Sequence, residues 1–438
     1  MKDKMKIKRR DFVKHSTLAT GAVVMSPLFQ KTNGFNYSVD DTIKISLIGC
    51  GGRGSGAAAQ ALLTKQNVKL VAMADAFRDN LDESLEEILK EVAADRIDVP
   101  EERKYVGFDA YLKAIPHCDV VILATPPGFR PIHFAEAIAQ DKHVFMEKPL
   151  ATDGPGVRKI LETAKEANRK RLNVIVGLQR HYQQKYLEMM DRIHRGKIGA
   201  ILSAQVYWNS DGVWVRERKP GQTEMEYQMR NWYYFNWLCG DHIVEQHIHN
   251  IDIANWALQN YPVKAQGRGG REVRKDIDHG EIFDHHYVEF QFADGCMMNS
   301  QCRHIKNCWS SVNEIIIGTK GSADFGAGIL KNHKGRIIYQ HDSKNDANPY
   351  QVEHDVLFDA IARGEYKFSD TENGAKSTLT AILGRMATYS GRMITWDEAI
   401  NSEVSIMPTK FAWNANPPVM PDKNGYYSIP IPGESKAV

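Results

Sequence analysis

The sequence predicts an α/β protein, in which a doubly wound parallel sheet is followed by an α+β domain. Short apolar strands alternate with helices between residues 43 and 177, and this alternation is typical of a parallel sheet. A glycine-rich loop directly follows the first of these strands. The later segments are typical of an α+β domain: helices at 185–195 and 369–388, and strands at 200–208, 287–292 and 314–317.

The composition of the 438 residues is that of a globular protein and excludes several classes. Hydrophobic residues make up 42% and charged residues 25%, which excludes a disordered chain and allows a large core. The formal net charge is +2, so no excess of positive charge points to nucleic acid. Six cysteines are too few to staple a fold, and no apolar run reaches the roughly 18 residues that cross a bilayer.

The first residues have the layout of an export signal. Basic residues, with Arg9 and Arg10 side by side, precede an uncharged and weakly apolar segment, as is typical of such signals. The paired arginines with Phe12 and Lys14 resemble a twin-arginine signal, which the export machinery recognises. We therefore expect residues 1–35 to be a signal, the location to be a bacterial periplasm, and the mature chain to have no membrane contact. If this terminus is only a basic tail, the protein is cytoplasmic.

A dinucleotide-binding motif follows the first strand, which is expected at residues 43–48. The pattern G-x-G-x-x-G begins at Gly49. Its first glycine permits a tight turn, its second lets the backbone approach a pyrophosphate, and its third lets helix and strand pack closely. A helix is expected at 55–65, with its N-terminus facing the phosphates. The cofactor-binding residues expected in this loop are Gly49, Gly51, Gly52, Arg53 and Gly54.

The second strand, at residues 68–74, leads into Asp75, which lies 21 residues after Gly54. An acidic residue at about this spacing accepts hydrogen bonds from the ribose hydroxyls of the cofactor. Its charge repels a 2′-phosphate and therefore favours NAD over NADP. Arg78 lies three residues further on, where it can contact such a phosphate, so NADP stays open.

Further strands and helices complete a first domain, which we expect over residues 42–180. Ligands of doubly wound sheets bind beyond the carboxyl ends of the strands. Asp75, Thr125, Glu147 and Lys148 all follow strand ends, so one crevice can hold them together. The further elements are helices at 81–92, 129–140 and 154–168, and strands at 118–124, 143–146 and 173–177.

Several segments together resemble a known family. They are the glycine loop, Ala-Thr-Pro-Pro at 124–127, Lys-His-Val-Phe-Met-Glu-Lys-Pro at 142–149 and the segment at 240–256. Over residues 43–400 the chain resembles the glucose–fructose oxidoreductase, inositol dehydrogenase and MocA-type (Gfo/Idh/MocA) family. The resemblance implies a Rossmann domain that binds NAD(P), and a second domain at 181–438 with a large open, mainly antiparallel sheet. It also implies a homo-oligomer, and a sugar or cyclitol substrate bound between the domains. The cofactor-binding residues then also include Thr125, Pro126, His133, Glu147 and Lys148.

The segment at 240–256 carries the expected catalytic base. Its pattern predicts one helix with an apolar face, on which Glu245 and His249 are four residues apart and share a face. His249 is the candidate base for the hydroxyl proton. The family has Asp where this chain has Glu245, and the longer side chain leaves open whether the carboxylate contacts His249 or the substrate. Lys148 is expected to position and polarise the reacting hydroxyl.

Other side chains are expected around the substrate. His181 and Tyr182 follow the last strand of the first domain, and the aromatic residues near 232 form either a platform for sugar rings or ordinary packing. A metal site is not expected, because the three histidines around Glu245 do not match zinc-site spacings. The expected substrate-binding residues are His181, Tyr182, Trp232, Tyr233 and His242.

Two reactions compete as the function. The first is NAD-dependent oxidation or reduction of a sugar, glycoside or cyclitol hydroxyl. The second is a redox-neutral glycoside hydrolase or lyase that keeps NAD tightly bound and passes through a transient keto-sugar. An export signal suits tightly bound NAD, because free cofactor is scarce outside the cytoplasm. We keep this reaction second, because family members known to hydrolyse glycosides have a different motif at 240–250. Lys148 and His249 argue against a third class, a sugar-binding protein without activity.

Overall fold

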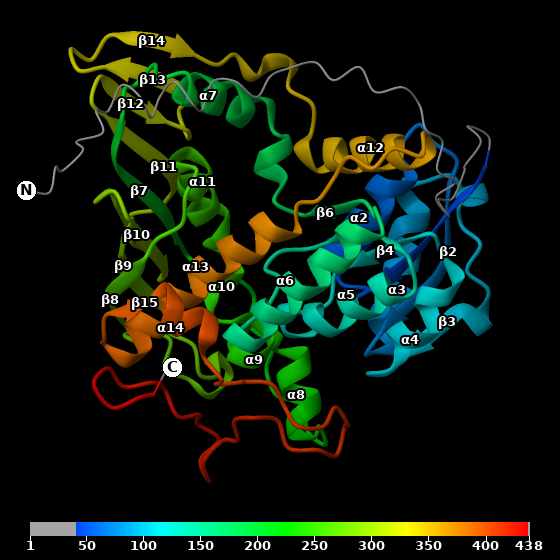
Figure 1. The fold of residues 1–438 in the computed structure, drawn as a ribbon. Coiled ribbons are helices and arrows are strands. Elements are labelled where there is room, and N and C mark those ends of the chain that lie inside the picture. The colour runs from blue at the N-terminus through cyan, green and yellow to red at the C-terminus, as the bar shows by residue number, and fades with distance from the viewer. Residues whose placement is uncertain (1–40, 437–438) are drawn as a thin grey trace, which may run out of the picture. The chain divides into compact units, whose positions relative to one another are not determined.

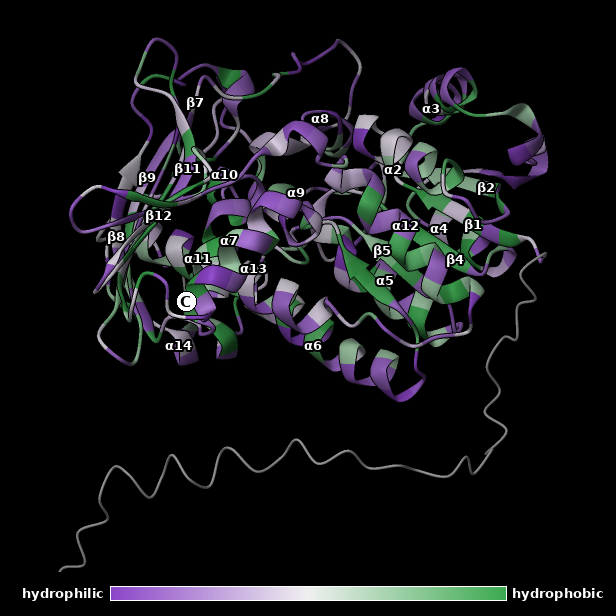
Figure 2. Cartoon of the chain, turned by 90° about the horizontal axis from the view of Figure 1, so that it is seen from above, coloured by the Kyte–Doolittle hydropathy of each residue, from purple (hydrophilic) through white to green (hydrophobic). Residues whose placement is uncertain are grey.

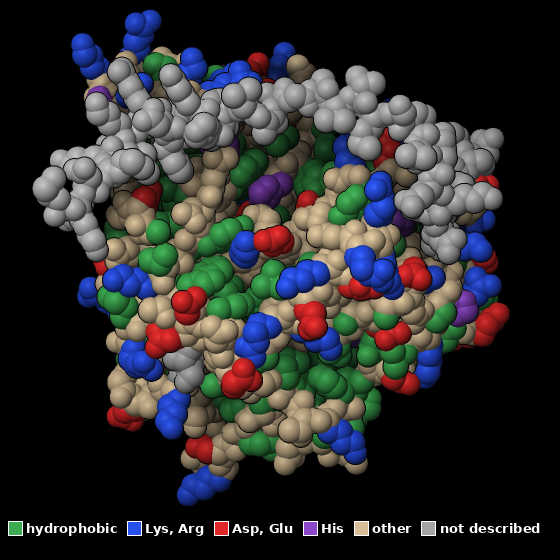
Figure 3. All heavy atoms as spheres, in the orientation of Figure 1, with side chains coloured by type: hydrophobic (Ala, Val, Ile, Leu, Met, Phe, Trp, Pro, Cys, Tyr) green, Lys and Arg blue, Asp and Glu red, His purple; other side chains and the backbone are tan. Residues whose placement is uncertain are grey.

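The computed structural model describes residues 41–436 (Figure 1). The predicted twin-arginine signal at 1–35 lies outside these residues. Among the described residues, no helix is both long and apolar enough to span a lipid bilayer. On the face that Figure 3 shows, Lys and Arg side chains are interspersed with Asp and Glu, as a net charge of +2 leads us to expect.

The first half of the chain forms a parallel six-stranded sheet, which confirms the predicted doubly wound fold. Its strand order is β3-β2-β1-β4-β5-β6, so the order reverses between β1 and β4. Along β4, Val120 and Ile122 pack into one hydrophobic cluster and Val121 and Leu123 into another, because helices cover both faces of the sheet. Figure 2 shows β4 and β5, at the centre of this sheet, as predominantly hydrophobic. The elements are β1 (Ile43–Ile48), α2 (Gly52–Leu62), β2 (Val68–Asp75), α3 (Arg78–Glu91), β3 (Lys104–Val106), α4 (Ala110–Ala114), β4 (Val120–Leu123), α5 (Arg130–Ala139), β5 (His143–Met146), α6 (Gly154–Arg169) and β6 (Val174–Val176).

The second half forms a nine-stranded sheet in the order β14-β13-β12-β11-β7-β10-β9-β8-β15. Among the described residues, its only parallel pair is β7 with β10, which confirms the expected large, mainly antiparallel sheet. Side chains along β9 and β10 alternate between buried and partly exposed, so one face packs on helices and the other does not. The strands are β7 (Ile201–Ser210), β8 (Lys264–Gly270), β9 (His285–Gln291), β10 (Met297–His304), β11 (Ser311–Gly318), β12 (Gly321–Asp324), β13 (Ile329–Asn332), β14 (Ile337–Gln340) and β15 (Ile394–Thr395).

Helices of the second half fill the space between the two sheets (Figure 1). The long helix α13 (Thr371–Ser390) contacts β8 and β9 on one side and α6 and β6 on the other. Helix α12 (Pro349–Ala362) packs on α2, although the sequence analysis did not predict it. The remaining helices are α7 (Gln184–His194), α8 (Glu224–Arg230), α9 (Asn236–Cys239), α10 (His242–Glu245), α11 (Ile248–Leu258) and α14 (Trp396–Asn401).

The expected single helix over residues 240–256 is wrong. Helix α10 ends at Glu245, a turn follows at Gln246 and His247, and α11 begins at Ile248. Helix α11 also has no exposed polar face, since nine of its eleven residues are buried. The reason is its position, because it packs against β7, β11 and α13 at once.

Candidate active site

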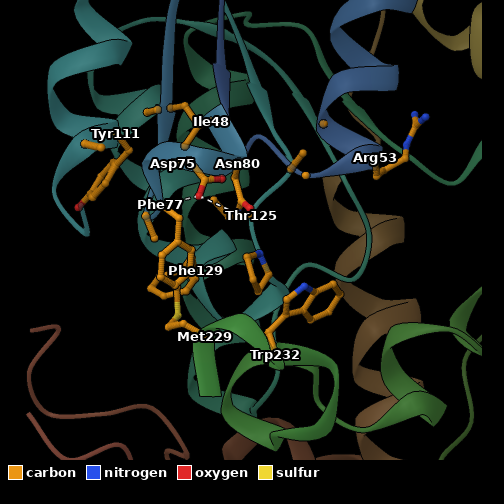
Figure 4. A pocket seen from close by; sticks show the side chains of 18 of the residues that line it. Ile48, Arg53, Asp75, Phe77, Asn80, Tyr111, Thr125, Phe129, Met229 and Trp232 are labelled. Carbon is orange, nitrogen blue, oxygen red and sulfur yellow. Dashed lines mark hydrogen bonds between the residues drawn. The ribbon is translucent and has the colours of Figure 1, made fainter. Parts of the chain in front are cut away.

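A cavity of about 380 Å³ opens at the carboxyl ends of β1, β2 and β4, where the strand order of the first sheet reverses. Such switch points are the usual ligand sites of doubly wound sheets. Residues of the second half close the cavity from the other side (Figure 4). These residues are Trp214, Arg216, Met229, Arg230 and Trp232.

The glycine loop forms one wall of the cavity, and the structural reason for a glycine differs from one position of the loop to the next. Gly49 has a φ of +95°, and a Cβ there would lie 2.4 Å from the Thr125 amide nitrogen. A Cβ on Gly54 would lie 2.0 Å from the Gly49 carbonyl oxygen. Gly51 and Gly52 instead face open space, next to the N-terminus of α2. Backbone without side chains at a helix N-terminus fits a pyrophosphate.

Asp75 lies at the edge of the same cavity, at the end of β2. Its carboxylate accepts a hydrogen bond from the Cys50 amide at 2.7 Å. It also accepts hydrogen bonds from the Phe77 amide at 2.9 Å and the Asn80 side chain at 3.1 Å (Figure 4). Burial raises the pKa of Asp75, although these donors oppose the shift. A carboxylate held this firmly fits the expected role of binding ribose hydroxyls.

Arg78 lies away from the cavity. Its guanidinium is half exposed and forms ion pairs with Asp82 at 2.7 Å and Glu101 at 2.5 Å. It does not line the cavity, so the structure gives no support to a contact with a 2′-phosphate. The ion pairs with Asp82 and Glu101 hold this side chain away from the cavity. The contact with Glu101 could not be predicted from the spacing of residues near Arg78 in the sequence.

Three further expected cofactor residues line the cavity, namely Thr125, Pro126 and His133, whereas Glu147 and Lys148 do not. The hydroxyl of Thr125 lies 3.2 Å from Nδ1 of His133. Burial, helped by the charge of Arg130, lowers the pKa of His133 to about 3. The His133 ring is therefore neutral, and it packs against Tyr111 with ring centroids 4.2 Å apart.

The adjacent residues Glu147 and Lys148, which follow β5, form ion pairs with different parts of the chain. Glu147 forms an ion pair with Arg53 of the glycine loop at 2.5 Å. The Lys148 ammonium lies 3.0 Å from the Glu245 carboxylate and 2.8 Å from the Glu245 carbonyl oxygen. This dipeptide thus joins the cofactor cavity, through Arg53, to the start of the α10–α11 region.

His249 lies in α11, close to this group of charges. Burial, and then the charges of Lys148, Arg180 and Arg53, hold the pKa of His249 well below its usual range. Its ring packs on Trp208 at 6.0 Å between centroids. Within residues 41–436 no hydrogen bond joins His249 to Glu245, whose partner is Lys148. The interruption between α10 and α11 removes the regular helix on which the shared face was expected.

Of the expected substrate-binding residues, only Trp232 lines the cavity. The imidazole of His181 pairs with Asp252 at 2.6 Å, and the hydroxyl of Tyr182 donates to Asp370 at 2.6 Å. Burial alone would lower the pKa of His181, but Asp252 outweighs it and the pKa is raised. Tyr233 and His242 are buried inside the second half.

An aromatic layer behind the cavity was missed by the sequence analysis. Phe77, Phe108 and Phe129 line the cavity, and the C-terminal segment packs on them. Trp413 lies 4.5 Å from Phe108 and 5.1 Å from Phe77, and Phe411 lies 5.3 Å from Phe129, between ring centroids. No motif or periodicity in this segment predicts the contact.

Comparison with known families settles the class of protein. The family described as "Oxidoreductase family, NAD-binding Rossmann fold" matches residues 43–203, and the "GFO/IDH/MocA C-terminal domain" matches residues 186–324. The chain belongs to the Gfo/Idh/MocA family. It is therefore an oxidoreductase-family protein with an NAD-binding domain, and the expected cofactor, NAD, is confirmed at this level.

Individual relatives of this Gfo/Idh/MocA protein agree with that assignment. An inositol 2-dehydrogenase of Cereibacter sphaeroides is 25% identical over 354 residues, which are 78% of this chain and 92% of that protein. Apo scyllo-inositol dehydrogenase from Lactobacillus casei is 20% identical with a TM-score of 0.62, covering 82% of this chain and 99% of that one. A levoglucosan dehydrogenase, in complex with NADH and levoglucosan, is 15% identical with a TM-score of 0.63, covering 81% and 99%. These two structures have the same fold as this chain.

Proposed function

We propose that this chain is an NAD-dependent oxidoreductase acting on a ring hydroxyl of a sugar, glycoside or cyclitol. One observation carries the proposal. Glu147 holds Arg53 of the cofactor loop, while the next residue, Lys148, holds Glu245 in the second half of the chain. A hydroxyl bound by Lys148 is therefore close to the cofactor cavity. The inositol and levoglucosan dehydrogenases among the relatives support this substrate class.

The proposed chemistry uses three side chains around the reacting hydroxyl. NAD, when bound, supplies the hydride acceptor. His249 takes the hydroxyl proton, since its low pKa keeps the ring neutral and able to accept one. Lys148 donates a hydrogen bond to the hydroxyl oxygen and stabilises its developing charge, and Glu245 fixes the position of the ammonium.

We further propose that NAD stays bound between turnovers, which favours the redox-neutral glycoside hydrolase or lyase as the second candidate. The aromatic layer supports this, because Phe411 and Trp413 pack against the ring side chains that line the cavity. A cofactor enclosed in this way leaves slowly. Slow release suits an enzyme that oxidises its substrate and then returns the hydride to the same molecule. Asp75 supports NAD rather than NADP as this cofactor.

Two properties of the whole protein belong to the proposal. The segment around Arg9 and Arg10 directs the folded chain to the periplasm through the twin-arginine machinery. The outer face of the nine-stranded sheet, with partly exposed side chains such as Tyr207 and Tyr287, contacts a second copy in a homo-oligomer. Cell fractionation of the full chain with both arginines changed to lysine checks the first property, and light scattering checks the second.

The deciding experiment measures redox change and bond cleavage together. The purified full chain is denatured and its supernatant assayed for NAD(H), which we expect to find. The native protein is then incubated with inositols, free sugars and aryl glycosides, while absorbance at 340 nm and aglycone release are both followed. Net NADH formation supports the first reaction, and aglycone release without net NADH supports the second. If the protein neither contains nor binds NAD, both are wrong.

Site variants test the assigned roles. His249→Asn and Lys148→Met should each lower kcat at least ~100-fold, as expected for lost proton transfer or charge stabilisation. His194→Gln, at an exposed position at the end of α7, is the matched control and should leave kcat unchanged.

The pH profile of the wild-type protein tests the role of His249. The acidic limb of the pH profile of kcat/KM should lie below pH 6.5, because the pKa of His249 is lowered. An acidic limb above pH 6.5 would exclude His249 as the base.

A further inference from the structure

A second group of polar side chains lies where α10 meets the nine-stranded sheet. It consists of Asp241, which precedes α10, His242 at the start of α10, His286 on β9 and His304 at the end of β10. At most 3% of the surface of each residue is exposed. None of the four lines the cofactor cavity.

Five imidazole nitrogens of this group have no hydrogen-bond partner among the described residues. They are both ring nitrogens of His242, both of His304, and Nε2 of His286. Buried polar atoms without partners are rare and unfavourable. The ring nitrogens of imidazole are common metal ligands, so a bound cation would explain all five of them together.

The distances between the potential ligand atoms suit one ion. Nε2 of His286 lies 3.3 Å from Oδ2 of Asp241, and Nε2 of His242 lies 3.8 Å from Oδ1 of Asp241. One ligand atom from each of the three residues can be chosen so that all lie within 4.8 Å of one another. Ligands at the zinc–nitrogen and zinc–oxygen distances of about 2.0–2.2 Å in a tetrahedron are about 3.3–3.6 Å apart. The three residues therefore need only small adjustments to bind one ion.

The hydrogen bonds around His286 direct a lone pair at Asp241. The Thr388 hydroxyl donates its only proton to the Arg385 carbonyl at 3.0 Å. It must therefore accept from Nδ1 of His286, which is also 3.0 Å away. With the proton on Nδ1, Nε2 faces the carboxylate with a lone pair. Two such acceptors are held together only by a cation, or by a second proton that makes the ring an imidazolium.

The backbone of Asp241 indicates that its position is fixed by its surroundings. Its φ of 73° and ψ of 160° lie in a region that residues other than glycine rarely adopt. The carboxylate is held by the Tyr389 hydroxyl at 2.6 Å and the Phe283 amide at 3.0 Å. Such outer hydrogen bonds are typical of carboxylates that ligate metals.

We propose that Asp241, His242 and His286 bind one divalent metal ion such as Zn²⁺, with His304 as the fourth ligand. The ring of His304 lies 4.3 Å from that of His242 between centroids, which is close enough for His304 to complete the site. The ion joins α10 to β9 and thereby fixes Glu245, three residues after His242, against Lys148. Because all four of these residues are almost completely buried, the ion holds the fold around the site and does not touch the substrate.

Metal analysis of the full chain tests the proposal directly. The untagged protein is dialysed against Zn²⁺ or Co²⁺ and then against metal-free buffer. We expect about one ion per chain, and for Co²⁺ the visible absorption of a tetrahedral site. Asp241→Asn and His286→Gln should lower the metal content at least ~10-fold, as expected for loss of a ligand. His285→Gln is the matched control, because His285 is on the same strand but faces the other side of the sheet, and it should keep the metal.

Three outcomes would overturn the site. The first is wild-type protein that retains neither metal after dialysis, which would indicate a protonated His286 paired with Asp241. The second is a folded Asp241→Asn or His286→Gln variant with the full metal content. If the ligand variants do not fold, the wild-type protein decides, since removing the metal with a chelator should lower its Tm and Zn²⁺ should restore it. A Tm that chelator and Zn²⁺ leave unchanged is evidence against the site. None of these measurements depends on turnover, so a negative result would overturn the metal site without contradicting the proposed activity.

Discussion

The Glu245 carboxylate lies 3.0 Å from the Lys148 ammonium, and the Glu245 backbone carbonyl accepts a second hydrogen bond from the same ammonium at 2.8 Å. Both side chains are only 11% exposed. A buried ion pair of this kind fixes the position of its members, and breaking it leaves an uncompensated charge. Glu245 therefore acts on Lys148, whereas the sequence left open whether its carboxylate contacts His249 or the substrate.

Glu245→Gln should lower kcat about 10–100-fold with a smaller change in KM, because the amide can still accept a hydrogen bond but no longer neutralises the ammonium. Glu245→Asp keeps the charge and should retain more activity than Glu245→Gln. Steady-state kinetics of both variants, together with their Tm values, checks this order. If Glu245→Gln lowers only Tm and leaves kcat intact, the pair is structural.

Gly51→Ala and Gly54→Ala should separate cofactor binding from folding. A Cβ on Gly54 would lie 2.0 Å from the Gly49 carbonyl oxygen, whereas a Cβ on Gly51 meets no atom within 4 Å. Gly54→Ala should therefore lower Tm by several degrees and also abolish NAD binding. Gly51→Ala should keep its Tm but weaken NAD binding at least ~10-fold, because the methyl group stands where the pyrophosphate approaches. Calorimetry without and with added NAD checks both, and a large loss of Tm in Gly51→Ala would contradict the assignment.

The parallel sheet could be predicted from the sequence because each of its strands is recognised from residues that are close together in the chain. The strands expected at 43–48 and 143–146 match β1 and β5 to the residue, since each is a short run of β-prone residues that is followed by a glycine or a polar residue. The glycine loop is equally local, and its order of strand, loop, helix and acidic residue leaves few alternatives.

The contacts that build the site could not be predicted in the same way. Lys148 and Glu245 are 97 residues apart in the chain, and Asp241 meets His286 only because a strand of the second sheet passes α10. Spacing along the chain carries no information on such pairs. It also led to the wrong expectation of one helix over 240–256, because tertiary packing interrupts the helix after Glu245.

Trp413→Ala should make NAD leave faster. Trp413 packs on Phe108 and Phe77, which line the cavity, and each aromatic pair contributes roughly 0.5–1.5 kcal/mol. Loss of both contacts is expected to raise the rate of NAD release about 10-fold. The NAD content after gel filtration and the dissociation rate of NADH measured by fluorescence check this. Trp309→Ala is the control, because Trp309 is 63% exposed and contacts Tyr207; equal NAD loss in both variants would show that the aromatic layer does not retain the cofactor.

His143→Gln should make the protein less sensitive to acid. Burial lowers the pKa of His143 to about 4, although Asp119 opposes the shift, and Nδ1 of the neutral ring accepts a hydrogen bond from the Asn173 amide at 2.9 Å. Because the folded pKa lies below the unfolded value of about 6.5, the unfolded chain binds more protons below pH 6.5, and stability falls as the pH falls.

The size of this effect follows from the same linkage. Between about pH 6.5 and pH 4, the wild-type protein should lose about 1.4 kcal/mol of unfolding free energy per pH unit relative to His143→Gln. Comparing the two proteins cancels the titration of all other groups. Urea unfolding of both at pH 7.5, 6.0 and 5.0 measures the difference, which should be constant above pH 7 and change steadily below pH 6. A difference that does not depend on pH would mean that His143 takes up its proton in the folded state as readily as in the unfolded chain.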